Sequence, residues 1–227
     1  MENLKEANYQ YGDMVGVEGG NMSYLSEAVF EPPTRLYHFL VIDRYIESEG
    51  DYEIHEAIAS GVRSGRLSWY KDDLYIVFRH NALLGDEYVA GLGEQACEKA
   101  SDFGRWGYDY LMYLYLLYDV PRAVIRNLVK ERRLRRIRPD ELPYRENHDS
   151  AICTVFANFV WRQVGLPVMG RVPALPAGYI QAYYDRRLRI VGGNVPAGRQ
   201  FKHLEKLPTY MAVLVKFCQE REAARGK

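Results

Sequence analysis

Apolar and polar positions alternate in short runs through the first third of the chain, which is the pattern of half-buried β-strands. These runs are rich in β-branched and aromatic residues, and polar turns such as Lys71-Asp72-Asp73 separate them. We expect strands over residues 12–17, 37–45, 52–58, 61–70 and 74–79. Successive strands joined by short turns predict an antiparallel meander.

Further along the chain, apolar positions recur at helical spacing. Pro121 suits the first turn of a helix, where its missing N–H is not needed, and Gly165 suits the end of one. We expect helices over residues 86–102, 108–119, 121–136, 150–164 and 209–225, a Pro/Gly-rich loop over 170–178 and one more strand over 182–191. This order predicts an α+β fold, an antiparallel sheet packed against helices, in a single domain over residues 1–227.

The composition supports a folded protein and argues against several classes. Apolar residues make up 48% of the chain, and 30 basic residues balance 30 acidic ones, so we expect a sizeable core and no nucleic-acid partner. The cysteines are widely spaced and no spacing resembles a zinc site, so we expect no metal and no other cofactor. We see neither a signal peptide nor an apolar run of the roughly 20 residues that span a bilayer, which favours a cytoplasmic protein.

One cysteine stands where an apolar helix should begin. Cys153 opens the run that ends at Trp161, and Asp149 or Ser150 could cap that helix. Free N–H groups at a helix N-terminus favour a thiolate, which is the nucleophilic form of cysteine. The alternative is that Cys153 is an ordinary buried cysteine, because free cysteine commonly packs as a small apolar residue.

A catalytic thiolate needs an imidazole base and a polar group that orients the imidazole. His38, in the apolar strand over 37–45, is a candidate base. The next strand offers Glu56 and His55 as the orienting group, and only one of them can face His38 because neighbouring strand residues point to opposite faces.

The remaining histidines and cysteines are weaker candidates. His148 is close to Cys153 in sequence, but that does not bring it close across the start of a helix. His80 and His203 have no partner pattern, and Cys97 and Cys218 fall inside expected helices, where packing is the simplest role.

The order of several short motifs resembles the permuted papain-like amidases of the NlpC superfamily, relatives of the lecithin:retinol acyltransferase branch. In that family a Gly-Asp strand, a strand with the histidine, a strand with the orienting residue, a Val-x-Arg strand, a Tyr-Asp pair and a final cysteine helix follow in turn. The matching segments here are Gly12-Asp13, Tyr37-His38-Phe39, His55-Glu56-Ala57 with Gly61-Val62, Val77-Phe78-Arg79, Tyr108-Asp109, and Cys153-Thr154 with Trp161 and Gly165. The resemblance covers roughly residues 11 to 168.

The resemblance implies a circularly permuted papain-like fold and a cysteine hydrolase, such as an amidase, peptidase or esterase. Cys153 would be the nucleophile, His38 the general base, and Glu56 the orienting residue, with His55 as the alternative third member. The substrate would be a small-molecule, peptide or lipid-like acyl compound. Two alternatives stay open: an acyltransferase that uses the same site, and a binding module without catalysis on this fold.

A basic segment follows the tyrosine-rich helix. Residues 122–138 combine eight basic side chains with one acidic residue and with apolar positions at helical spacing. They lie in a helical insertion at about 119–148 that the family does not require. Such a segment predicts weak contact with an anionic membrane. The alternative is a solvated face whose cations pair with acidic residues of the same chain.

Overall fold

The computed structural model describes residues 4, 7–18, 26–83, 87–102, 107–108, 110–144, 150–170 and 172–194. The helix expected over 209–225, together with Asp149, His148, His203 and Cys218, lies outside the described residues. No helix in the described ranges is long and apolar enough to cross a membrane.

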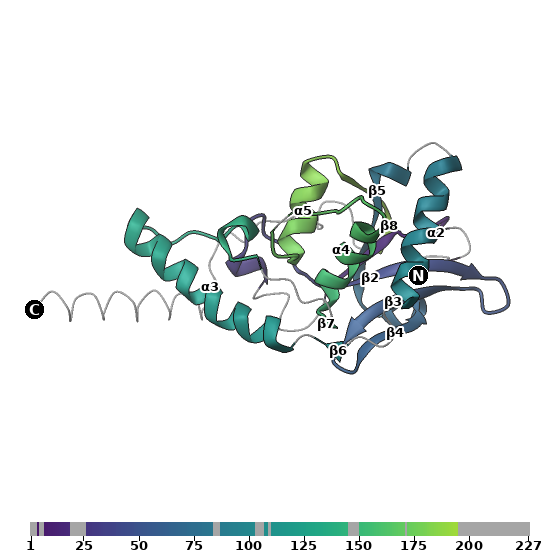
Figure 1. Ribbon diagram of the computed structural model, residues 1–227, viewed down its shortest axis with the longest axis horizontal. Coiled ribbons are helices and arrows are strands. Elements are labelled where there is room, and N and C mark those ends of the chain that lie inside the picture. Colours follow the sequence, from purple (N-terminus) through teal and green to yellow (C-terminus); the bar gives the residue numbers. More distant parts are fainter. Residues whose placement is uncertain are drawn as a thin grey trace, which may run out of the picture.

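A six-stranded antiparallel sheet forms the centre of the molecule (Figure 1). Its strand order is β4-β3-β2-β1-β5-β8. The bounds are β1 (Met14–Glu18), β2 (Leu36–Ile46), β3 (Asp51–Ile58), β4 (Gly61–Arg66), β5 (Leu74–His80) and β8 (Leu188–Gly193). The α+β class and an antiparallel meander over β1 to β4 are therefore confirmed, but the expectation that the meander continues to β5 was wrong, because β5 crosses back to pair with β1. β2, which carries His38, lies inside the sheet between β1 and β3.

The main helices are α2 (Glu87–Asp102), α3 (Tyr110–Glu131), α4 (Cys153–Gln163) and α5 (Pro176–Tyr184). Short 3-10 turns η1 (Leu67–Tyr70), η2 (Asn81–Leu83) and η3 (Pro139–Glu141) connect them to strands and loops. A two-residue parallel pair, β6 (Gly107–Tyr108) and β7 (Ser150–Ala151), lies outside the main sheet.

Three expected boundaries were wrong. Helices 108–119 and 121–136 are one helix, α3, with Pro121 inside it. The residues expected as a loop and a strand at 170–178 and 182–191 contain α5 instead, which begins at Pro176, and β8 starts only at Leu188. The strand expected over 61–70 ends at Arg66 and continues as η1.

The two faces of the sheet are buried by different layers because side chains alternate along each strand. Phe39 and Val41 point to the face that packs against α2, α4 and α5, and this cluster holds the buried Trp161 and Phe156. Leu40 and its neighbours on the opposite face pack with the N-terminal segment and η1. Both faces of β2 are therefore covered, which fixes its register.

The Gly12-Asp13 and Val-x-Arg motifs meet in space. The buried Asp13 carboxylate accepts hydrogen bonds from Arg79 Nε at 2.9 Å and from Arg79 Nη2 at 2.8 Å. Gly12 has a φ of 83° and its carbonyl accepts a 3.0 Å hydrogen bond from Trp161 Nε1. A Cβ at Gly12 would lie 2.6 Å from the Trp161 ring, so glycine is required. These contacts tie α4 to β1, the strand beside the one that carries His38.

A separate apolar cluster attaches α3 to the rest of the fold. Ala123 and Val124 of α3 pack with Val29 and Phe30, and with Ile137 after the helix. Figure 1 shows α3 lying to one side of the sheet and its covering helices.

We predict that Asp13→Asn lowers the free energy of unfolding by about 3 to 5 kcal/mol, because it leaves the Arg79 guanidinium without its charged partner in a buried setting. Urea unfolding measures this value. The matched control is Arg44→Gln, which breaks the solvent-exposed Arg44–Glu53 pair between β2 and β3 and should cost under about 1 kcal/mol. Equal losses for the two variants would contradict a structural role for the Asp13–Arg79 pair.

Candidate active site

Cys153 is the first residue of α4. The preceding residue, Ile152, is the N-cap and offers no side-chain hydrogen bond, so the expected cap at Ser150 is wrong; Ser150 belongs to β7. The first N–H groups of α4 are thus not used by an N-cap side chain, and they remain a local positive field beside the sulfur. Cys153 Sγ also lies 3.7 Å from the backbone oxygen of Tyr37, the residue before His38.

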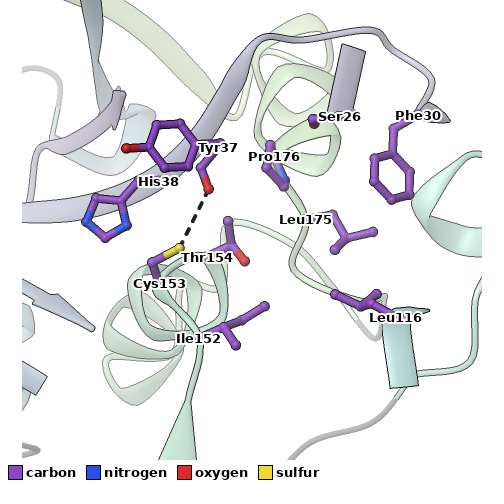
Figure 2. Close-up of a pocket in the computed structure, with 10 residues that line it drawn as sticks. All are labelled: Ser26, Phe30, Tyr37, His38, Leu116, Ile152, Cys153, Thr154, Leu175 and Pro176. Carbon is purple, nitrogen blue, oxygen red and sulfur yellow. Dashed lines mark hydrogen bonds between the residues drawn. The ribbon is translucent and has the colours of Figure 1, made fainter. Parts of the chain in front are cut away.

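His38 and Glu56 face one another from neighbouring strands. Leu40 pairs with Glu56 in the register of β2 and β3, so His38, two residues before Leu40, points to the same face as Glu56. His38 Nε2 lies 2.7 Å from Glu56 Oε2. The Cys153 side chain lies beside the same imidazole at the wall of the cavity (Figure 2). The structure therefore brings the three residues singled out in the sequence together, with His38 between Glu56 and Cys153.

The Glu56 carboxylate is fully buried and holds two further donors. Tyr70, at the end of η1, donates its hydroxyl to Glu56 Oε2. Arg63 of β4 places Nε 2.9 Å and Nη2 2.8 Å from Glu56 Oε1. Both oxygens of this carboxylate are thus occupied, which fixes its orientation toward the imidazole.

The protonation of the pair follows from these contacts. Burial disfavours the charged imidazole, but the hydrogen bonds to Cys153 and Glu56 outweigh it and raise the pKa of His38 to about 10. Burial likewise disfavours the thiolate, yet His38 and the backbone hydrogen bonds of Phe39 and Thr154 lower the pKa of Cys153 below that of an ordinary thiol. The pKa of Glu56 is also lowered, because its hydrogen-bond donors outweigh its burial. The imidazole and the helix N-terminus therefore both favour the thiolate form of Cys153 over the thiol.

A cavity of about 270 Å³ opens beside Cys153 and His38 (Figure 2). Most of its wall is apolar, and it comes from five separate parts of the chain: residues 26–30, β2, α3, the start of α4 and the start of α5. The lining residues are Ser26, Phe30, Tyr37, His38, Leu116, Ile152, Cys153, Thr154, Leu175 and Pro176. Within the described residues, the hydroxyls of Ser26 and Thr154 are buried without a hydrogen-bond partner. Such groups are costly unless a ligand or water pairs with them.

His55, the alternative orienting residue, is used elsewhere. Its Nε2 lies 3.0 Å from Asp43 Oδ2 and its Nδ1 lies 3.1 Å from Ser64 Oγ, on the face of the sheet opposite Glu56. This chain of hydrogen bonds satisfies both nitrogens of a buried imidazole. Of the two candidates, Glu56 is the one that contacts His38.

The other described histidine and cysteine lie in the core. His80 stacks on Trp161, with ring centroids 4.7 Å apart, and burial together with the charge of Arg187 lowers its pKa to about 4. The thiol of Cys97 donates to the Ile42 carbonyl, and burial raises its pKa. Among the described residues, no three His, Cys, Asp or Glu side chains gather in a way that could hold a metal ion.

Sequence reasoning missed the two residues that hold Glu56. Arg63 was accessible from the sequence, because the tight turn between β3 and β4 places it directly opposite Glu56. Tyr70 carried no comparable signal, since η1 returns to the sheet only through tertiary packing. The apolar cavity walls from Phe30, Leu116 and Leu175 were not recognised either.

No known protein-family model matches this chain, and no curated protein sequence matches it.

We predict that the rate at which iodoacetamide alkylates Cys153 begins to fall at a lower pH than it does for an ordinary thiol, because His38 lowers the pKa of Cys153. An ordinary thiol would slow about tenfold for each pH unit below its pKa. Peptide mass spectrometry separates this reaction from that of Cys97, whose raised pKa and burial should keep it slow. Faster labelling of Cys97, or a rate at Cys153 that begins to fall at the pH of an ordinary thiol, would contradict the lowered pKa of Cys153.

Proposed function

We propose that this protein is a cysteine hydrolase of the amidase, peptidase or esterase type that works through an acyl-enzyme on Cys153. The observation that carries the proposal is that Cys153, at the start of α4, lies beside His38, whose ring is hydrogen-bonded to the buried Glu56 carboxylate. This arrangement supplies a thiolate, a proton donor and a fixed carboxylate partner within one partly enclosed site.

In the first half of the reaction, the Cys153 thiolate attacks the carbonyl carbon of the substrate and a carbon–sulfur bond forms. The carbonyl oxygen gains the negative charge, and the helix N-terminus at Cys153 lies next to it as an electrostatic support. The His38 imidazolium gives its proton to the departing amine or alkoxide, and the bond to that group breaks. A thioester on Cys153 and a neutral His38 remain.

In the second half, a water molecule attacks the thioester. Neutral His38 takes a proton from the water, the carbon–sulfur bond breaks, and the carboxylic acid leaves. The thiolate and the imidazolium are restored. If another nucleophile, such as an amine or alcohol, replaces water, the same residues carry out acyl transfer.

The cavity beside the sulfur suits the acyl part of the substrate. Phe30, Leu116 and Leu175 give it an apolar wall, which favours an uncharged group over a charged one. The buried hydroxyls of Ser26 and Thr154 would be satisfied by a carbonyl or hydroxyl on that group.

The fold that we propose is the circularly permuted papain-like fold. Its support is the order of the elements, in which the histidine strand precedes the cysteine helix by more than a hundred residues. The contacts of Gly12 and Asp13 with Trp161 and Arg79 add to this support, because they explain why motifs far apart in the chain occur together.

We predict that brief incubation with p-nitrophenyl butyrate, followed by an acid quench, leaves one butyryl group on Cys153 of the wild-type protein. Intact-protein and peptide mass spectrometry detect the adduct. Cys153→Ala should carry none, and Cys97→Ala should behave as the wild type. If the wild-type protein gains no adduct and releases no p-nitrophenol, the protein is a binding module instead of an enzyme.

Added glycine methyl ester distinguishes hydrolysis from acyl transfer in the same assay. Free butyric acid as the main product supports a hydrolase, and the butyryl amide as the main product supports an acyltransferase that uses this site.

We predict that Glu56→Gln lowers kcat/KM for that ester by on the order of 100-fold, because the imidazolium loses its charged partner. The alkaline limb of the pH–rate profile should move below the value set by the His38 pKa of about 10, since Glu56 raises that pKa. Glu53→Gln, on the same strand but paired with the exposed Arg44, is the matched control. A Glu56→Gln profile that matches the wild type would remove Glu56 from the mechanism.

A further inference from the structure

The outer face of α3 exposes an unusual amount of apolar surface. Leu114, Leu117, Tyr118, Ile125 and Val129 are between 46% and 63% exposed. Leu114, Tyr118, Ile125 and Val129 follow one another at spacings of i, i+4, i+11 and i+15, so they share one stripe along the helix. The opposite side of α3 packs on the fold through Ala123 and Val124. The stripe therefore faces away from the core.

A ridge of cations borders this stripe. Arg122, Arg126 and Lys130 are exposed and recur every four residues, so they line up along one flank of the apolar positions. Arg122 also lies over the Tyr118 ring, with its guanidinium carbon 5.9 Å from the ring centroid. Apolar side chains next to a row of cations form the surface of a helix that lies on a membrane.

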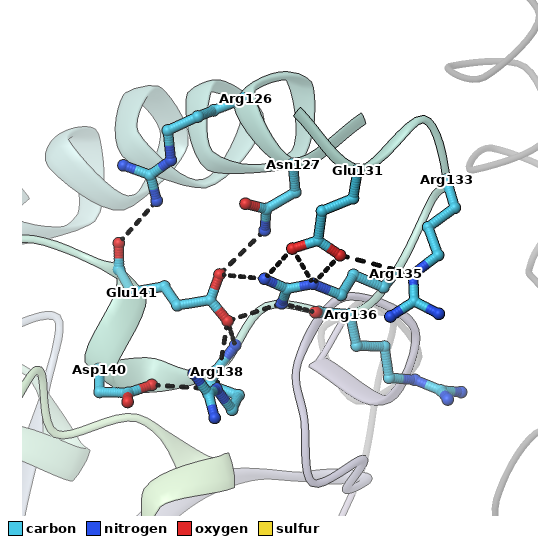
Figure 3. A network of polar contacts seen from close by, with 9 residues as sticks. All are labelled: Arg126, Asn127, Glu131, Arg133, Arg135, Arg136, Arg138, Asp140 and Glu141. Atoms are coloured by element: carbon cyan, nitrogen blue, oxygen red, sulfur yellow. Dashed lines mark hydrogen bonds and ion pairs between the residues drawn. The ribbon is translucent and has the colours of Figure 1, made fainter. Parts of the chain in front are cut away.

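The arginines after α3 have a different role (Figure 3). Arg135 binds Glu131 at 2.9 Å and Glu141 at 2.7 Å, and Arg138 lies 3.4 Å from Glu141. Asn127 donates to the same Glu141 carboxylate at 2.9 Å. This network fixes the end of α3 against η3.

Arg126 also donates to the Glu141 backbone oxygen at 3.1 Å, so it takes part in both the cation ridge and this network (Figure 3). The basic segment thus divides into a structural part, at 131–141 with Arg126, and an outward-facing part, in which Arg122 and Lys130 of α3 have no bond to this network.

We propose that the outer face of α3 docks on the surface of an anionic lipid bilayer. The apolar stripe enters the boundary between headgroups and acyl chains, and Arg122 and Lys130 meet the lipid phosphates. Leu116, on the side of α3 toward the fold, lines the cavity beside Cys153. Docking therefore holds one wall of the cavity close to the bilayer surface.

Charge favours lipid over a second copy of this chain. Between residues 114 and 133, Glu131 is the exposed carboxylate, and Arg135 and Arg133 already bind it. Two copies that paired through this face would bring their cation ridges together without acidic partners. An anionic bilayer supplies the missing negative charge.

The test is co-sedimentation of the full chain with vesicles of equal parts phosphatidylcholine and phosphatidylglycerol. We expect binding at low salt, weaker binding at high salt, and little binding to vesicles of phosphatidylcholine alone. Arg122→Gln/Lys130→Gln should weaken binding by about 30-fold. Ile125→Ser/Val129→Ser should weaken it by at least about tenfold, with an unchanged circular dichroism spectrum because both positions are exposed.

Arg44→Gln/Lys71→Gln makes the same change in charge outside α3 and should bind as the wild type does. Cys153→Ala should also bind normally, so a failure of the cysteine chemistry leaves this result unaffected. Equal loss of binding in both charge variants would overturn the proposal, because it would show that the vesicles attract the protein's positive charges in general and not the outer face of α3. The absence of vesicle binding would also overturn it, as would a dimer in sedimentation that Ile125→Ser/Val129→Ser dissociates.

Discussion

The buried carboxylate of Glu56 is the constraint on which the site depends. A carboxylate without solvent exposure stays ionised only when donors surround it. Here His38, Tyr70 and Arg63 provide them, from β2, η1 and β4 respectively. The same contacts turn the imidazole toward Cys153 and stabilise its charge. The charge state of the sulfur therefore depends on residues that never touch it.

The approach of Cys153 to His38 requires that α4 and β2 keep a fixed position relative to one another. The packing around Trp161 provides that restraint, because its ring is fully buried and fits against Gly12, which has no side chain. Tyr179 of α5 adds a second restraint: it stacks on Phe39 with centroids 4.0 Å apart and donates to the Thr154 carbonyl at 2.6 Å. The residues on either side of the Cys153–His38 contact are thus held by the core.

α3 contributes both to the cavity beside Cys153 and to the proposed membrane-binding surface. Its inner side completes the apolar cavity through Leu116, and its outer side carries the exposed stripe and the cation ridge. Pro121 lies inside the helix without ending it. Proline has no N–H, so the carbonyl of Leu117, four residues earlier, receives no hydrogen bond from position 121. Leu117 lies on the exposed side of α3, where water can bond that carbonyl instead. The sequence signal for a break at Pro121 was therefore misleading.

By itself, the sequence determined the first four strands of the sheet and the residue types of the site, because period-two alternation and a cysteine before an apolar helix are local patterns, but it did not show that β5 returns to pair with β1. Only the tertiary structure decided that Cys153 meets His38 and that Glu56, instead of His55, is its partner. Alternation gives two faces to each strand but does not say which face another element covers. The same limit hid Tyr70 and the cavity walls, since contacts between distant segments leave no periodic trace in the chain.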